Sequence, residues 1–262
     1  MHYALLVFAL VLTCTSARAD GWSPGANPDP QAILEEARTD TKAGRYETAL
    51  AKHVWIHEHA LEVKPAFYGV RLSFALAYWR ELAQEYPPAL TKLKEIRDAA
   101  RANVVAGKNV RESFHDMASI NDHLGEHETT KEVFEALVEK DQNAAREVFE
   151  LALPSLIKGK AYALIDDYIS PKSDFSRFRE RYLQGKQLAN EPRFGARHLE
   201  FVNKKFANDS TTLVAILAVN DRKPEAEEIA ALAREEWNDE TFHKALDEAL
   251  QGVVPAPWPS TR

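Results

Sequence analysis

The feature that most constrains the fold is a spacing of small residues that recurs along the first two thirds of the chain. A helix crossing needs a small side chain where two backbones approach, and a glycine helps the chain to reverse. The aligned small residues are Ala37, Ala83, Ala118 and Ala152, with separations of 46, 35 and 34 residues. A large residue stands four positions before each alanine: Ile33, Trp79, Phe114 and Val148. The spacing therefore predicts repeated helix–turn–helix units whose large residues fill the space between stacked hairpins.

Turn residues follow the same period. Gly44, Gly125 and Gly159 lie at one common offset after their alanines, and Pro87-Pro88 takes that role in the second copy. The first copy reads Ala37, then Gly44-Arg45-Tyr46, then Ala49-Leu50. This pattern resembles the tetratricopeptide repeat (TPR), a helix–turn–helix unit of about 34 residues. The resemblance extends from Pro30 to Tyr168 and is weakest in the second copy.

The resemblance implies an all-α fold, a TPR-like α-solenoid of antiparallel helix hairpins over residues 31–170. No alternating strand pattern and no Gly-rich phosphate loop interrupts the helical spacing. After residue 170 the repeat register is lost, so residues 171–252 are predicted to form a C-terminal helical region that caps the solenoid. Its predicted helices cover residues 173–190, 195–207, 211–219, 225–237 and 240–251. Asn208-Asp209-Ser210 is interpreted as a helix start, and three prolines predict an extended, mobile tail over residues 253–262.

The N-terminus resembles an export signal. Ala4 to Thr13 form an apolar run that is too short to span a bilayer, and Ala17-Arg18-Ala19 supplies a small-residue cleavage site. Residues 1–19 are therefore predicted to be a signal peptide, followed by a Gly- and Pro-rich linker over residues 20–30. The prediction places the protein in the periplasm or outside the cell, with no integral membrane segment after cleavage. Lipid anchoring through Cys14 is the less favoured alternative, because Thr13 fits a lipoprotein signal poorly.

Charge and cysteine content exclude several classes of function. Cys14 is the only cysteine, so cleavage after Ala19 leaves no disulfide, no thiol nucleophile and no cysteine zinc site. The formal net charge is −7, which argues against general binding to nucleic acid or to anionic membranes. No cofactor and no metal are expected.

The favoured function is a scaffold or adaptor that binds a protein partner without catalysis. In TPR proteins the concave surface is formed by outward positions of each first helix. Carried over through the aligned alanines, those positions are Arg38, Arg80, His115, Asp122 and Arg146. Three arginines in an acidic chain suit a peptide carboxylate or an acidic segment of another protein. The Arg-rich stretch over residues 176–182 is interpreted instead as a solvated helix face.

Two other functions stay open. A cell-envelope enzyme acting on wall polymer would use a polar cluster as its site, composed of His115, Asp116, Asn121, Asp122, His123 and His127. A small-ligand or sugar-binding module would use an aromatic region, composed of Trp55, Tyr68, Trp79 and Tyr86. A zinc site is not predicted at His53 and His57, because Val54 stands where the zinc-protease motif has its glutamate.

Overall fold

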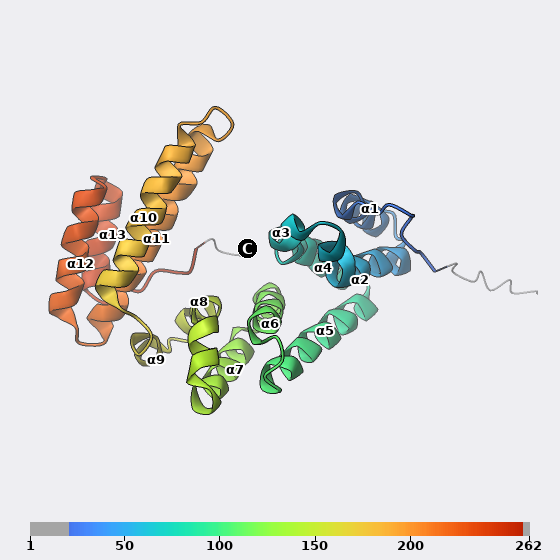
Figure 1. The fold of residues 1–262 in the computed structure, drawn as a ribbon, viewed down its shortest axis with the longest axis horizontal. Helices are drawn as coiled ribbons and strands as arrows, with labels where there is room; N and C mark the ends of the chain where they lie inside the picture. Colours follow the sequence, from blue (N-terminus) through green and yellow to red (C-terminus); the bar gives the residue numbers. More distant parts are fainter. Residues whose placement is uncertain (1–20, 259–262) are drawn as a thin grey trace, which may run out of the picture. The chain divides into compact units, whose positions relative to one another are not determined.

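The computed structural model describes residues 21–258, which contain thirteen α-helices, one short 3-10 turn and no strand (Figure 1). The predicted all-α class is confirmed. The predicted signal peptide and Cys14 lie outside the described residues, as do residues 259–262. None of the helices within residues 21–258 combines the length and the apolar character needed to cross a membrane. The chain divides into two compact units, residues 1–71 and 72–262.

The described part of the first unit is a helix hairpin followed by a short helical turn. It comprises α1 (Pro30–Lys42), α2 (Tyr46–Val63), the 3-10 turn η1 (Pro65–Phe67) and α3 (Tyr68–Arg71). Asp29 caps α1, because its carboxylate accepts a hydrogen bond from the backbone N–H of Gln31 at 3.1 Å. Gly44 has a φ of 74°, in the left-handed region that glycine adopts readily, and it turns the chain into α2.

The interior of this unit contains buried charges. Lys52 Nζ lies 2.8 Å from Asp40 Oδ2 and 2.7 Å from Glu36 Oε2, and Arg45 Nη2 lies 2.6 Å from Asp40 Oδ1. Burial alone would raise the pKa of the Asp40 carboxyl, but the hydrogen bonds and charges of Lys52 and Arg45 outweigh burial and lower that pKa. The buried ionic contacts therefore fasten α1 to α2.

The second unit begins with six helices that pack as successive hairpins: α4 (Phe74–Glu85), α5 (Pro87–Val105), α6 (Val110–Leu124), α7 (His127–Lys140), α8 (Gln142–Lys158) and α9 (Tyr162–Asp166). Each helix contacts the next, and α6 also contacts both α4 and α8. The aligned large residues Trp79, Phe114 and Val148 are fully buried. The predicted turns at Gly125 and Gly159 both fall between helices. The last turn differs in detail, since Lys160 rather than Gly159 takes the positive φ, 54°.

The C-terminal region contains four helices, one fewer than predicted: α10 (Pro171–Ala189), α11 (Gly195–Val219), α12 (Lys223–Glu236) and α13 (Glu240–Leu250). The predicted break at Asn208-Asp209-Ser210 is wrong, because α11 runs through it. Asp209 binds Lys205 one turn earlier at 2.5 Å instead of capping a helix. Ser210 is buried together with the run from Thr211 to Leu217, so tertiary packing overrides the local signal.

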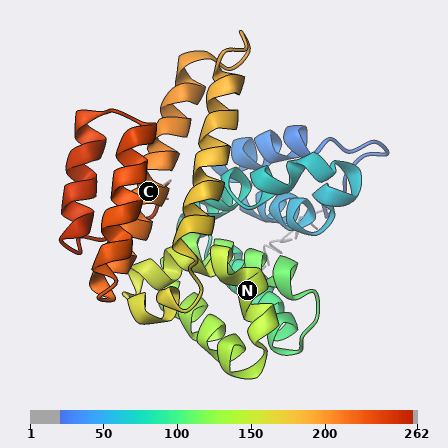
Figure 2. The same cartoon turned by 60° about the vertical axis from the view of Figure 1, so that its left-hand side comes forward.

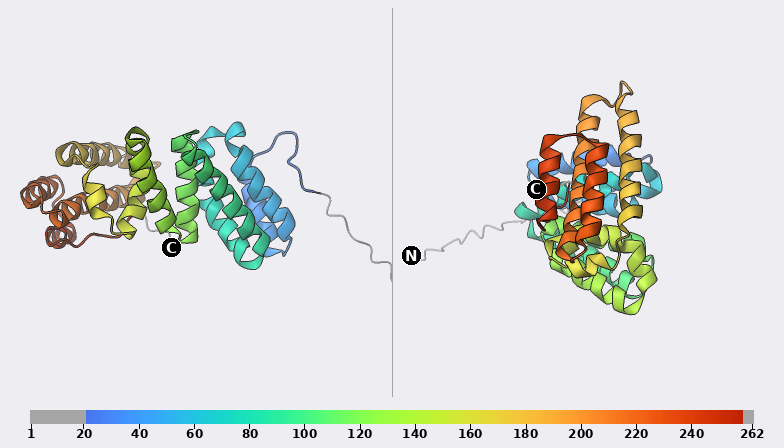
Figure 3. Two further views of the ribbon diagram at one scale, coloured as in Figure 1. Left: turned by 90° about the horizontal axis from the view of Figure 1, so that it is seen from below. Right: turned by 90° about the vertical axis from the view of Figure 1, so that its left-hand side faces the viewer.

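An aromatic core holds these four helices together, and Figures 2 and 3 show α12 and α13 alongside the α10–α11 hairpin. Tyr182 stacks on Phe206 with ring centroids 4.4 Å apart, and Phe242 stacks on Trp237 at 5.1 Å. Gly185 allows the close approach of α10 and α11, because a Cβ atom there would meet Val202 Cγ2 at 2.6 Å.

The described part of the predicted tail is extended and contacts α11. Asn208 Nδ2 donates to the Ala256 carbonyl at 2.9 Å, and the Trp258 ring lies 4.8 Å from the Phe201 ring. Val254 packs against the apolar cores of both the repeats and the C-terminal helices. Residues 253–258 therefore form an extended strip, with its prolines and aromatic ring packed on the helix.

Candidate functional site

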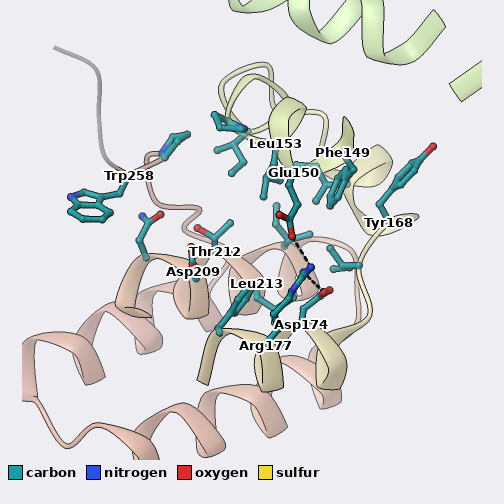
Figure 4. A pocket seen from close by; sticks show the side chains of 18 of the residues that line it. Phe149, Glu150, Leu153, Tyr168, Asp174, Arg177, Asp209, Thr212, Leu213 and Trp258 are labelled. Atoms are coloured by element: carbon teal, nitrogen blue, oxygen red, sulfur yellow. Dashed lines mark hydrogen bonds and ion pairs between the residues drawn. The ribbon is translucent and has the colours of Figure 1, made fainter. Parts of the chain in front are cut away.

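A cavity of about 480 Å³ lies within the second unit, between α8, α9, α10, α11 and residues 257–258 (Figure 4). Its volume is within the range of small-ligand sites. The repeats contribute α8 and α9, and the C-terminal region contributes α10, α11 and the tail. The cavity thus forms where these two segments meet.

One wall of the cavity is aromatic and aliphatic. The rings of Phe149 and Tyr168 stack with centroids 5.0 Å apart, and Leu153 lies beside them on α8 (Figure 4). In the same view Trp258 lies on the opposite side of the cavity. Pro154 stands inside α8 at this wall and has no N–H for the Glu150 carbonyl one turn earlier. The wall can bury apolar or aromatic groups of a ligand.

Several charged side chains in the cavity are paired with one another. Arg177 lies between two carboxylates, 2.6 Å from Glu150 Oε1 and 2.7 Å from Asp174 Oδ1 (Figure 4). Lys205 Nζ lies 2.5 Å from Asp209 Oδ1. Burial raises the pKa of the Asp209 carboxyl, and the charge and hydrogen bond of Lys205 offset only part of that effect. Of these pairs, Arg177–Glu150 joins α10 to α8, and the other two lie within a single helix.

Two guanidinium groups in the lining form no ion pair with a described residue: those of Arg111 on α6 and Arg146 on α8. Arg111 Nη1 donates to the Glu147 carbonyl at 2.5 Å, which orients it along α8. Arg146 lies over the Tyr168 ring, 5.4 Å from its centroid. Both side chains are exposed. Each therefore has N–H groups that can bind an anion from solvent.

Thr212 adds an unsatisfied hydroxyl to the cavity. The residue is only 8% exposed, and its Oγ1 has no hydrogen-bond partner among the described residues. Figure 4 shows it beside Asp209. A buried hydroxyl without a partner costs about 1 to 3 kcal/mol, and less than 1 Å² of this oxygen is accessible from the cavity.

The five sequence-predicted groove residues lie on four different helices. Arg146 lines the cavity, whereas Arg80 and His115 lie on α4 and α6 outside its lining, and Arg38 belongs to the first unit. Asp122 belongs to a separate contact, with its Oδ1 2.8 Å from Lys158 Nζ and 3.5 Å from His127 Nδ1.

The candidate catalytic cluster lies on α6 and at the start of α7, outside the cavity lining. Asn121 is buried and donates from Nδ2 to Thr130 Oγ1 at 3.0 Å. His127 lies 3.0 Å from Lys158 Nζ, and burial, followed by the Lys158 charge, lowers its pKa. These contacts join α6, α7 and α8 outside the cavity lining. In the chain from residue 21 to 258, no group of three or more His, Cys, Asp or Glu side chains could hold a metal ion.

The residues of the predicted aromatic region fall in both units. Trp55 and Tyr68 lie in the first unit, and Trp79 and Tyr86 lie in the second. Trp79 belongs to the core, where its Nε1 donates to the Ala89 carbonyl at 3.0 Å. His53 is also buried, and burial lowers its pKa to about 3, so it is neutral at physiological pH.

Sequence reasoning missed most of the cavity. Arg177 and Arg181 fall in the stretch interpreted as a solvated face, yet both line the cavity. Their spacing of one helical turn was the available signal. Arg111 and Thr212 carry no comparable local signal.

Comparisons with known proteins place the chain in no family, since no family model, curated protein or solved structure matches it.

Proposed function

We propose that this protein is an exported, TPR-like scaffold that binds a segment of another protein without catalysis, and that the cavity is its binding site. The observation that carries the proposal is the pairing of an apolar wall with two guanidinium groups that lack carboxylate partners among the described residues, Arg111 and Arg146. Export rests on the apolar run and small-residue site before Asp20.

The packing of the second unit supports the TPR-like part of the proposal. In such solenoids the first helix of each hairpin packs on the first helix of the next hairpin. Here α4 contacts α6, and α6 contacts α8, while α5 and α7 bridge between successive hairpins. The aligned alanines Ala118 and Ala152 are buried on α6 and α8. This arrangement resembles three stacked hairpins.

The chemistry of the lining indicates the ligand. Arg111 and Arg146 suit a carboxylate, because a guanidinium can donate two parallel hydrogen bonds to it. The Phe149–Tyr168 stack suits an apolar or aromatic side chain next to that carboxylate. A peptide with an acidic or C-terminal carboxylate and one large apolar side chain combines these two groups.

A small carboxylate-bearing molecule is the second candidate. The cavity volume of about 480 Å³ favours it, because single small molecules fill sites of this size. The same guanidinium groups and aromatic wall would hold it.

Site-specific cross-linking tests the proposal. The photoreactive residue p-benzoylphenylalanine would replace Trp258 at the cavity rim, and the protein would be cross-linked in its native extract. We expect a protein adduct that Arg111→Glu with Arg146→Glu abolishes. The matched control, Arg101→Glu with Lys108→Glu, reverses two exposed charges outside the lining and should retain the adduct.

The remaining outcomes separate the alternatives. An adduct lost only in Arg38→Glu with Arg80→Glu would favour the sequence-predicted groove and refute the cavity as the site. An adduct retained in all variants would also refute it. No protein adduct, combined with a small molecule co-purifying with wild type and absent from the Arg111/Arg146 variant, would favour the second candidate.

A further inference from the structure

The loop end of the α10–α11 hairpin, residues 186–204, has a surface unlike the rest of the chain. We call this segment the hairpin tip. Of nine exposed large hydrophobic residues in the described chain, four lie here: Leu188, Phe194, Leu199 and Phe201. Their exposed fractions are 39%, 37%, 38% and 49%. Such clustering marks an interaction site more often than scattered exposure does.

The hairpin tip has almost no core of its own. Residues 186–201 contain no buried residue, and the last members of the aromatic core toward the tip are Tyr182 on α10 and Val202 on α11. Figures 1 and 2 show the tip projecting beyond the ends of α12 and α13. The exposed apolar groups therefore stand clear of the helices that pack on the rest of the hairpin.

The charge of the hairpin tip is opposite to that of the whole chain. Its cations are Lys186, Arg193, Arg197 and Lys204, and its acidic residues are Glu191 and Glu200. The tip thus carries a formal charge of +2 in a chain of −7. Arg193 lies over the Phe194 ring, 4.7 Å from its centroid, so a cation and an exposed aromatic ring stand together.

We propose that the hairpin tip docks on a phospholipid surface with anionic headgroups, with Phe194 and Leu199 entering the interface and Arg193 and Arg197 binding the headgroups. Exposed apolar groups beside basic residues are the pattern of interfacial membrane contact. The net charge of the whole chain disfavours binding to anionic membranes. The projecting tip has the opposite charge, so it can still bind anionic headgroups.

A lipid surface fits this end better than a protein does. Stable protein interfaces bury about 800 Å² on each partner and need a complementary surface. Two helix ends and their connection, residues 190–194, form a narrow projecting end instead. A bilayer adapts to such a shape, so a few side chains suffice for reversible attachment.

Vesicle co-sedimentation of the full chain tests this proposal. We expect the protein to sediment with vesicles containing phosphatidylglycerol at least about tenfold more strongly than with phosphatidylcholine vesicles, and added salt should weaken binding. Phe194→Ser with Leu199→Ser, and separately Arg193→Glu with Arg197→Glu, should each lower partitioning by about tenfold or more. The control, Phe74→Ser with Arg101→Glu, alters a ring that is more exposed (61%) and an exposed cation, both outside the tip, and should bind like wild type.

A local probe makes the test independent of bulk sedimentation. An environment-sensitive fluorophore, attached to the thiol that Ala196→Cys introduces in a chain also carrying Cys14→Ser, should gain emission on anionic vesicles. Absence of binding to anionic vesicles, or binding that both tip variants retain, would overturn the proposal. Tip variants that lose a protein partner while wild type ignores vesicles would assign the tip to a protein surface instead. The cross-linking experiment on the cavity uses none of these residues, so either proposal can fail alone.

Discussion

The two units bury different chemistry. Four Asp, Lys, His or Arg residues are buried within residues 21–258, and all four lie in the first unit: Asp40, Lys52, His53 and Arg71. The C-terminal helices of the second unit bury aromatic and aliphatic side chains instead, with Phe206 at the centre. The difference teaches that the chain uses charge pairing where one helix hairpin stands on a small core, and packed aromatic side chains where four helices share a core. We therefore expect the stability of the first unit to depend on pH and on charge substitutions. The stability of the C-terminal helices should depend on the size of the buried side chains.

Phe206→Ala should have the largest effect. Phe206 is buried and its ring packs against those of Tyr182 and Phe242. The cavity left behind should lower the free energy of unfolding by about 4 kcal/mol, measured by urea denaturation followed by circular dichroism. The matched control is Phe201→Ala on the same helix, which removes a half-exposed ring and should cost less than about 1 kcal/mol. Equal costs for the two changes would mean that the aromatic core is not what stabilises these helices.

Lys52→Met should act on the first unit. The change leaves the buried Asp40 carboxylate with Arg45 as its remaining charged neighbour in the contact. Loss of one partner from a buried ion pair costs about 3 kcal/mol. Hydrogen exchange of peptides from residues 30–63 should accelerate, while peptides from α10–α13 keep their protection. Lys42→Met, at an exposed site on α1, is the control. Unchanged exchange in Lys52→Met would show that the buried ion pair is dispensable.

Acid should weaken the first unit through His53. Burial lowers the pKa of His53 to about 3, against an ordinary value of 6.5. The folded protein holds His53 in its neutral form, whereas the unfolded chain protonates it below about pH 6.5. The stability that depends on neutral His53 is therefore present above pH 6.5 and is lost as pH falls from 6.5 toward 3. At pH 5 the loss should be about 2 kcal/mol relative to pH 7.5. The same hydrogen-exchange measurement at both pH values checks this. The His53→Gln variant should lose most of that pH dependence, and an identical pH response in both proteins would contradict the assignment.

Gly185→Ala should have the smallest effect on stability, and it tests how closely α10 and α11 must pack. The new Cβ would meet the stiff, buried Val202 side chain. We expect a net loss of about 1 kcal/mol, because the clash exceeds the helix propensity that alanine gains over glycine. Adding Val202→Ala should relieve the clash, so the double variant should be more stable than Val202→Ala alone. Stabilisation by Gly185→Ala on its own would show that α10 and α11 tolerate a wider separation.

Much of the helix pattern could be predicted from sequence, because glycine and proline act locally. Gly44, Gly125 and Pro171 mark helix ends by their own backbone preferences, whatever lies around them. Asn208-Asp209-Ser210 has equally local signals, yet its helix continues. Lys205 binds Asp209, and the run after Ser210 is buried against other helices. The packing brings together residues from different helices, and a local sequence pattern cannot predict which helices will meet.

The candidate site was less predictable for the same reason. The alignment of repeats selected Arg146, which does line the cavity, but it could not include α10 and α11, where no repeat register exists. Arg111 points along α8 only because the two helices pack. The extended tail contributes Trp258, a residue that proline content alone assigned to a mobile end.

The continuity of α11 has a mechanical consequence. Its 25 residues form a rod of about 37 Å. It starts in the hairpin tip, and Lys205 to Ile216 form one cavity wall. The predicted joint at Asn208 would have let the two ends swing separately. Without that joint, the tip and the cavity wall belong to one continuous helix. We therefore expect a ligand bound at one end of α11 to affect the position of the other end.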